Sequence, residues 1–267
     1  MKPKYHVVSF SGGKDSTAML LRMIEENMQI DEILFCDTGL EFPEMYDHVK
    51  KVEEYIGRPI TKLKAEKDFM YWAAEHEFTT NSGKIKGYPK GSTVKGYGYP
   101  SMRLRWCTRS LKIDIINKHL TELNKKYEVC QYIGIAADEQ HRKKEFNYPL
   151  IDWNMTEADC IQYCKERGFD FGGLYEIWSR VSCWCCPLQG TDSMRKLKTH
   201  RPQLWDELKK IDDALKNSGQ PMIQFGRASF TDISNRFEVE DEFVAQGKKL
   251  RTKEFFNELK RRGIKYI

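Results

Sequence analysis

The first third of the chain alternates between short apolar runs and amphipathic stretches. An apolar run rich in β-branched and aromatic residues covers 5–10, and a helix-forming stretch follows at 17–26. A second apolar run lies at 33–36; a helix is expected over 43–56, and a strand at 59–63. Buried strands separated by helices predict βαβ crossovers and a parallel sheet.

The middle of the chain combines one long irregular segment with further regular elements. A short aromatic helix is expected at 68–77, and a glycine-rich loop at 78–109. A helix at 110–123, a strand at 129–135 and a helix with a capping-box-like start at 156–159 are expected next. The sequence therefore continues the alternation of strands and helices beyond the loop.

The last part of the chain is expected to be mainly helical, with helices starting near Thr191, Pro202 and Thr252. We therefore predict an α/β domain over residues 1–190, with helices on both faces of a parallel sheet. A C-terminal, mainly helical extension is predicted over residues 191–267.

Composition and charge limit the class of protein. At 267 residues, 40% hydrophobic and 31% charged, the chain has an ordinary globular composition rather than a disordered one. No run approaches the roughly 18 apolar residues of a membrane span, and no signal peptide is recognisable. We expect a cytoplasmic protein that does not enter a membrane.

The net charge of +5 is unevenly distributed. No acidic residue occurs from Phe78 to Ile113, a window with eight cations: Lys84, Lys86, Lys90, Lys95, Arg103, Arg105, Arg109 and Lys112. Such a basic, tyrosine-bearing loop (84–109) could bind a nucleic-acid acceptor through phosphates and stacked bases. The alternative is a solvated lid over a triphosphate.

The motif with the clearest chemistry is Ser-Gly-Gly-Lys-Asp-Ser, directly between the first strand and the first helix. Its members are Ser11, Gly12, Gly13, Lys14, Asp15 and Ser16. Glycines let an anion approach the backbone, and the start of a helix offers unpaired N–H groups and a favourable dipole. Lys14 adds a positive charge. The order strand, glycine turn, helix therefore predicts a phosphate-binding loop, although it is not a Walker A motif.

Eight cysteines in a chain expected to be cytoplasmic suggest ligands, nucleophiles or core residues rather than disulfides. Cys183 and Cys186 form a C-x-x-C pair with Cys185 between them, and Cys107 lies in a basic turn. A set of Cys107, Cys183, Cys185 and Cys186 would suit a [4Fe–4S] cluster or zinc. Adjacent cysteines ligate together only with a local kink, so one of them is alternatively a sulfur-carrying thiol. The remaining cysteines are expected in the core.

Four segments in this order make the chain resemble the phosphoadenosine phosphosulfate (PAPS) reductase family and the N-type ATP pyrophosphatases. They are residues 11–16, residues 37–39 with 42–44, Gly134 with 138–142, and 148–159 leading to the cysteine cluster. The resemblance spans about residues 5–188. It implies a Rossmann-like fold of the adenine nucleotide alpha hydrolase type.

The resemblance also implies roles for individual residues. The loop 11–16 would hold the nucleotide phosphates, Asp37, Thr38 and Gly134 would border adenosine, and Arg142 would face the anionic end. Lys14, Asp15 and Cys185 are our candidates for catalysis. Sulfonucleotide reductases of this family use a cysteine in a C-terminal motif, whereas this sequence has none after Cys186.

These observations favour an enzyme that binds ATP with Mg²⁺, adenylates an acceptor, releases pyrophosphate and couples this to sulfur transfer. One alternative is a thiol-dependent reductase of PAPS or of adenosine phosphosulfate (APS), which would release sulfite. Another is a nucleotide-binding regulatory module with structural zinc. A sulfur-donor or electron-donor protein is expected as a partner, and the sequence leaves open whether the chain forms a homo-oligomer.

Overall fold

The computed structural model describes residues 1–80, 89–220, 223–225 and 228–265. It divides into two compact units, each built from two separate segments. Unit 1 comprises Met1–Glu66 and Thr108–Trp184, and unit 2 comprises Lys67–Cys107 and Cys185–Ile267. The predicted boundary near residue 190 stays a prediction. Lys84 and Lys86 of the predicted basic loop lie outside the described residues.

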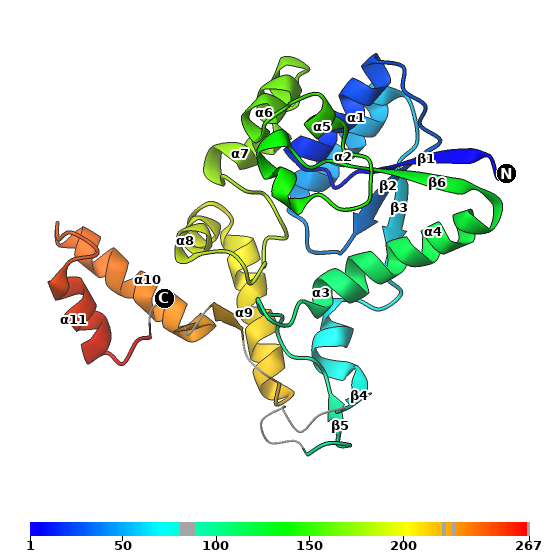
Figure 1. Cartoon of the computed structure of the whole chain (residues 1–267). Helices are drawn as coiled ribbons and strands as arrows, with labels where there is room; N and C mark the ends of the chain where they lie inside the picture. Colours follow the sequence, from blue (N-terminus) through cyan, green and yellow to red (C-terminus); the bar gives the residue numbers. More distant parts are fainter. Residues whose placement is uncertain (81–88, 221–222, 226–227, 266–267) are drawn as a thin grey trace. The chain divides into compact units, whose positions relative to one another are not determined.

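Unit 1 is built on a four-stranded parallel sheet in the order β3-β2-β1-β6, which confirms the predicted α/β fold (Figure 1). The strands are β1 (Lys4–Ser9), β2 (Glu32–Asp37), β3 (Thr61–Lys64) and β6 (Glu128–Ile133). Alternate residues of β1 and β2 point to opposite faces, and both faces are buried. The sheet therefore requires helices on each side.

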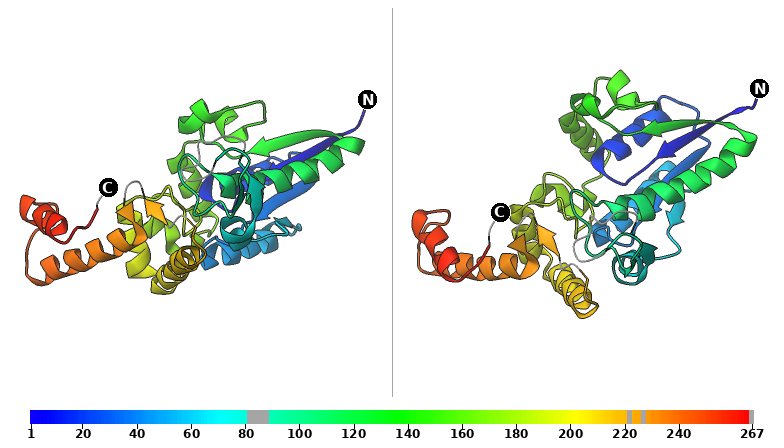
Figure 2. Two further views of the ribbon diagram at one scale, coloured as in Figure 1. Left: turned by 90° about the horizontal axis from the view of Figure 1, so that it is seen from below. Right: turned by 60° about the horizontal axis from the view of Figure 1, so that its bottom comes forward.

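Helices cover both faces of this sheet, as predicted (Figure 2). Helices α1 (Lys14–Glu25) and α2 (Pro43–Ile56) pack on one face, with α5 (Pro149–Asp152) and α6 (Glu157–Glu166) against α1. On the other face lie η2 (Arg109–Ile113) and α4 (Asp114–Lys126). Short turns η3 (Ala137–Arg142), η4 (Phe171–Gly173) and α7 (Leu174–Ile177) complete unit 1.

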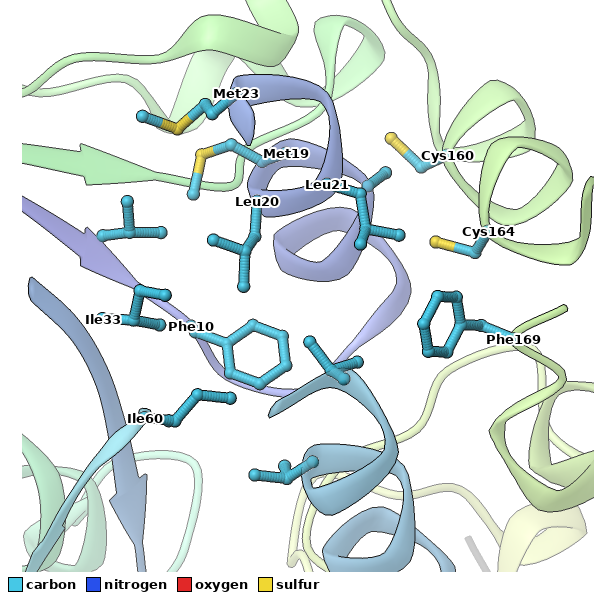
Figure 3. Close-up of a cluster of buried hydrophobic side chains, with 14 of the residues drawn as sticks. Phe10, Met19, Leu20, Leu21, Met23, Ile33, Ile60, Cys160, Cys164 and Phe169 are labelled. Atoms are coloured by element: carbon cyan, nitrogen blue, oxygen red, sulfur yellow. The ribbon is translucent and has the colours of Figure 1, made fainter. Parts of the chain in front are cut away.

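The main core of unit 1 lies between the sheet and α1 (Figure 3). Phe10 and Ile33 from the sheet side meet Leu20 of α1, and Cys160 and Cys164 of α6 approach α1 from its far side. Both thiols are fully buried, which confirms the expectation that they are core residues. The same expectation was wrong for Cys36 and Cys130, which are only partly buried. The core thus holds the start of α1 firmly against the sheet.

Unit 2 contains two short hairpins and several helices. The hairpins are β4 (Glu77–Thr79) with β5 (Thr93–Lys95) and β7 (Gln224–Phe225) with β8 (Ala228–Ser229). The helical elements are η1 (Tyr71–Glu75), α8 (Thr191–His200), α9 (Pro202–Asn217), α10 (Phe230–Ala245) and α11 (Lys253–Arg261); α3 (Trp106–Thr108) spans the boundary. The expected C-terminal helices are therefore present.

The segment expected as an irregular loop at 78–109 is partly regular, which corrects that expectation. Strands β4 and β5 pair within it, and Gly96 leaves β5 with φ of 72°. A Cβ at Gly96 would lie 2.4 Å from the carbonyl oxygen of Ala73. Gly96, taken as a sign of a loop, therefore also serves close packing against η1.

Among the described residues, no helix is both long and apolar enough to cross a membrane.

Candidate nucleotide site

The predicted phosphate loop connects β1 to α1 at the carboxyl edge of the sheet. Gly12 has φ of 79°, and a Cβ there would lie 2.9 Å from the Cε atom of Met45 in α2. The backbone N–H of Ser11 donates to the Ser16 hydroxyl over 3.1 Å, and that of Gly13 to the Ser11 hydroxyl over 3.4 Å. The loop is thus folded around its own hydroxyl groups, with Gly12 at its tightest position.

Lys14 is held by two carboxylates. Its Nζ lies 3.0 Å from Asp15 and 2.5 Å from Glu157 of α6. Burial alone would lower the pKa of Lys14, but these carboxylates outweigh it and raise the pKa above its usual value. Burial raises the pKa of Asp15, while Lys14 opposes that shift. The positive charge of Lys14 is therefore present and already largely balanced.

Glu157 is a site residue that the sequence reasoning did not identify. It is the first residue of α6, whose capping box between Thr156 and Asp159 confirms the predicted helix start. The Glu157 N–H donates to Asp138, which follows β6, over 3.1 Å. The only signal in the sequence was an acidic residue in the first turn of a well-capped helix.

Two aromatic side chains, Tyr175 and His48, form hydrogen bonds with the loop and the start of α1. Neither was predicted as a site residue. The backbone N–H of Lys14 donates to the Tyr175 hydroxyl over 3.0 Å. The Thr17 hydroxyl lies 3.0 Å from Nε2 of His48, and His48 stacks on Phe171, which also contacts Tyr175. Burial raises the pKa of Tyr175 to about 12 and lowers that of His48 to about 4. Both are therefore neutral at physiological pH.

Gly134 brings the end of β6 against the start of α1. A Cβ on Gly134 would lie 2.8 Å from Cα and 2.9 Å from N of Ser16. Only glycine allows two backbones to approach this closely. The structure thus brings together Ser16 and Gly134, which the sequence reasoning placed at one nucleotide.

Next to this contact lies a cavity of about 180 Å³ within unit 1. Its lining residues are Ser9, Phe10, Ser11, Ser16, Leu34, Cys36, Lys112, Ile116, Ile133 and Gly134. In open parallel sheets, ligands bind at this carboxyl edge. The cavity adjoins the phosphate loop and has the mainly apolar lining that suits a nucleoside.

Lys112, on one wall of the cavity, belongs to a polar cluster around Glu41. Its Nζ lies 3.1 Å from Glu41, which also accepts from the Thr38 hydroxyl over 3.1 Å. The Cys183 thiol lies 3.6 Å from the same carboxylate. Burial would lower the pKa of Lys112, but Glu41 and its neighbours raise it. Thr38 and Cys183, singled out separately in the sequence, therefore share one partner.

Two other predicted nucleotide residues are engaged with the protein. Asp37 accepts from the Gly39 N–H over 2.8 Å and from the Tyr46 hydroxyl over 2.7 Å. Arg142 pairs with Glu139 on the exposed turn η3. The nucleotide roles of both stay predictions.

The four cysteines of the predicted ligand set are divided between the units. Cys183 belongs to unit 1, and Cys107, Cys185 and Cys186 belong to unit 2. In unit 2, the Tyr99 hydroxyl donates to the Cys185 carbonyl, and burial and these three cysteines raise the pKa of Tyr99. In the part of the chain that the structure describes, no group of three His, Cys, Asp or Glu side chains is placed to hold a metal ion. The four-cysteine site stays a prediction.

Comparison with known proteins decides the family. Residues 5–189 match the model of the phosphoadenosine phosphosulfate reductase domain. The chain belongs to the PAPS reductase domain family. The resemblance seen in the sequence is thereby confirmed, and membership of the PAPS reductase family implies an adenine nucleotide as ligand.

Two relatives and one solved structure are similar to this PAPS reductase family chain. An uncharacterized protein of Methanocaldococcus jannaschii is 29% identical over 77% of the chain and 41% of its own length. An uncharacterized nin region protein of Escherichia phage lambda is 28% identical over 62% of the chain and 60% of its own length. The chain thus spans about half the length of these relatives. A phosphate complex of PAPS reductase from Candida auris is 16% identical, with a TM-score of 0.44 over 70% of this chain and 83% of that one.

Proposed function

We propose that the chain is an adenylating enzyme of the ATP pyrophosphatase type. It binds MgATP at the phosphate loop, and an acceptor oxygen attacks the α-phosphorus. The bond from that phosphorus to the bridging oxygen breaks, so that pyrophosphate leaves and the acceptor carries AMP. A sulfur nucleophile then forms a C–S bond to the acceptor, and AMP departs with the original oxygen.

The observation that carries this proposal is the pairing of Lys14 with Asp15 and Glu157. In this loop, two carboxylates balance the one ammonium group. Such a loop is poorly suited to a nucleotide that carries several negative charges and no bound metal ion. A nucleotide that arrives with Mg²⁺ brings its own positive charge, so its net charge suits this surrounding. ATP with Mg²⁺ is therefore favoured over PAPS, whose additional phosphate is not balanced by a metal ion.

The residues of unit 1 support defined parts of this reaction. The cavity beside Gly134 would take the nucleoside, and the loop N–H groups would bind the phosphates in place of their present hydroxyl partners. Lys14 would stabilise the negative charge that develops on the leaving pyrophosphate. Tyr175 and His48 would hold the loop in place without contacting the nucleotide.

Cysteine thiolates are suitable ligands for a [4Fe–4S] cluster and for zinc. The donor chemistry of Cys107, Cys183, Cys185 and Cys186 therefore fits such a group, and we propose these four as its ligands. A bound cluster would supply or hold the sulfur for transfer. If Cys185 is instead not a ligand, it is our candidate for carrying a persulfide from a sulfur-donor protein.

The second candidate is a thiol-dependent sulfonucleotide reductase, favoured by the family itself, whose matching model is that of PAPS reductase. The two functions differ in their products. An adenylating enzyme given its acceptor exchanges labelled pyrophosphate into ATP, because pyrophosphate attacks the adenylated acceptor in the reverse step, and it forms no sulfite. A reductase given labelled PAPS forms a protein thiosulfonate and releases sulfite in a single turnover.

We therefore suggest anaerobic purification followed by both assays on the same sample. The proposal predicts a brown protein with absorbance near 400 nm and ATP–pyrophosphate exchange. Cys107→Ser should remove the absorbance, whereas Cys164→Ser, in the core of unit 1, should retain it. Sulfite release without exchange would contradict the adenylating function, and a colourless protein with one zinc would contradict the cluster.

A further inference from the structure

A tight turn in unit 2 presents unusual side chains to solvent. The N–H of Ser101 donates to the Leu104 carbonyl over 3.1 Å, and the N–H of Leu104 donates back to the Ser101 carbonyl over 3.2 Å. The Ser101 hydroxyl accepts a further bond from Leu104 N–H over 3.1 Å. These bonds fix the backbone of the turn, so its tip is an ordered feature rather than a loose loop.

Apolar and cationic side chains alternate along this turn. Met102 is 78% exposed and Leu104 is 47% exposed, and Arg103 and Arg105 are exposed beside them. Single exposed apolar residues are ordinary, but two that alternate with two arginines on one ordered turn suggest a surface that contacts a partner. The partner should offer both negative charge and an apolar face.

The charge of the chain is concentrated in unit 2. It has 24 lysines and arginines against 15 aspartates and glutamates, whereas unit 1 has 20 against 24. Unit 2 is therefore net +9 and unit 1 net −4, and the turn lies within the window that lacks acidic residues. A strongly anionic partner would be attracted to unit 2 rather than to unit 1.

Half-buried aromatic rings from the same unit add a second kind of contact. Tyr97 lies 4.6 Å from Phe78 and is stacked parallel to Trp72 at 6.2 Å. Aromatic rings of this kind stack on nucleobases, whatever the sequence of the strand. Met and Leu side chains on a protein surface also insert between bases.

We propose that the turn Ser101–Arg105 binds a polynucleotide, which would be the acceptor of the adenylation reaction. This inference rests on the proposed function, because it names the substrate class of that reaction. Arg103 and Arg105 contact backbone phosphates, and Met102 and Leu104 lie against unpaired bases. Cys107 follows two residues after Arg105, so the bound strand reaches the part of unit 2 that holds the cysteines.

The test is fluorescence anisotropy with a fluorescein-labelled 20-nucleotide single strand, without ATP and at several salt concentrations. The same base sequence is tested as single-stranded DNA, as single-stranded RNA and as duplex DNA. The variants are Arg103→Ala/Arg105→Ala, Met102→Ala/Leu104→Ala and, as a control, Lys249→Ala/Lys260→Ala. The control removes the same charge from exposed positions of unit 2 that lie outside the turn.

The arginine variant should bind the single strand about tenfold more weakly. In a plot of log affinity against log salt concentration, the magnitude of its slope should be smaller by roughly 1.4, since each phosphate contact contributes about 0.7. The apolar variant should also bind more weakly. Its salt slope should not change, because the contact of apolar side chains with bases releases no counterions. The control should change the affinity much less, and single strands should bind more tightly than the duplex. The DNA and RNA arms identify which polynucleotide is preferred.

Several outcomes would overturn the inference. Equal effects of the arginine variant and the control would indicate only general charge attraction. An unchanged Kd for the strand with a raised KM for ATP would make the segment a lid. If the turn variants weaken the binding of phosphatidylserine vesicles as much as that of the strand, the turn is a membrane-binding surface instead. ATP–pyrophosphate exchange without any strand binding would refute this inference and leave the proposed function intact, whereas strand binding without exchange would refute the proposed function.

Discussion

Unit 1 and unit 2 place cysteine and charge in contrasting surroundings. In unit 1, Cys160 and Cys164 are sealed in the core, and burial raises the pKa of both thiols. In unit 2, Cys107, Cys185 and Cys186 lie near enough to Tyr99 to add to the effect of burial in raising its pKa. Unit 1 is acidic and unit 2 basic. Two thiols of unit 1 thus serve as core packing, whereas three cysteines of unit 2 lie near one hydroxyl group, with Cys185 buried and Cys107 and Cys186 partly exposed.

This contrast suggests that the two units have different functions. Unit 1 contains the loop 11–16 and the cavity of about 180 Å³ beside it, and the charge of Lys14 in that loop is paired. Unit 2 contains three of the four candidate cysteines and the exposed basic turn. We infer that nucleotide activation belongs to unit 1 and acceptor binding to unit 2. Variants of either unit can test this assignment of roles.

The largest expected effect is that of Lys14→Ala. The variant should lower ATP–pyrophosphate exchange by about 10²–10³-fold, as expected when one preorganised charge is lost from a transition state. It should leave the Kd for a single-stranded polynucleotide unchanged. Lys50→Ala, on the exposed side of α2, is the control and should retain exchange. Loss of strand binding in Lys14→Ala would contradict the division between the units.

The next effect concerns the pH dependence of stability in unit 1. Burial lowers the pKa of His48 from 6.5 to about 4, so the unfolded chain binds more protons between these values. The free energy of unfolding should therefore fall as pH drops from about 6.5 towards 4, by up to about 3 kcal/mol from this residue. Urea unfolding of the wild type and His48→Gln at several pH values measures this. Identical pH profiles for the two proteins would show that His48 is not buried in the neutral form.

A smaller effect is expected for Gly134→Ala. The added Cβ would meet the backbone of Ser16, which cannot move aside as a side chain would. We expect a loss of about 1–3 kcal/mol, typical of overpacking, together with weaker nucleotide binding. The control is Gly190→Ala in unit 2, where a Cβ meets nothing within 4 Å. Calorimetry in the presence and absence of ATP would measure both changes, and an unchanged melting temperature for Gly134→Ala would contradict the close contact.

The smallest change tests the thiols themselves. Burial raises the pKa of Cys164 from 9 to about 12, which leaves about 10³-fold less thiolate at neutral pH. Iodoacetamide should therefore leave Cys160 and Cys164 unlabelled in the native protein and label them after denaturation, as read by peptide mass spectrometry. Labelling of these two in the native state would remove the contrast between the units.

Much of the fold could be predicted because its signals are local. Pro43 at the first turn and Gly57 in the left-handed conformation fix both ends of α2, which runs over the residues expected. The apolar runs gave three strands nearly in place and a fourth, β6, that ends two residues early at Ile133. Helix α10 was missed, because its capping box at Ser229 follows a short hairpin without a clear apolar period.

The site was predictable only where the motif is contiguous. The loop 11–16 and Gly134 lie together as expected from their residue types. The partners that determine the electrostatics come from far along the chain: Glu157 is 143 residues from Lys14, and Tyr175 is 161 residues from it. No local pattern encodes such pairs. The cysteine ligand set stays a prediction for the same reason.

The contact between Gly134 and Ser16 also bears on how nucleotide preference could change during evolution. Gly134 and Ser16 both line the cavity, and their backbones approach so closely that a Cβ on Gly134 would separate β6 from α1; we call this pair the floor of the cavity. Its walls are side chains, among them Cys36, Lys112 and Ile116. Relatives that retain this floor can therefore diversify in the nucleoside they accept only through those walls.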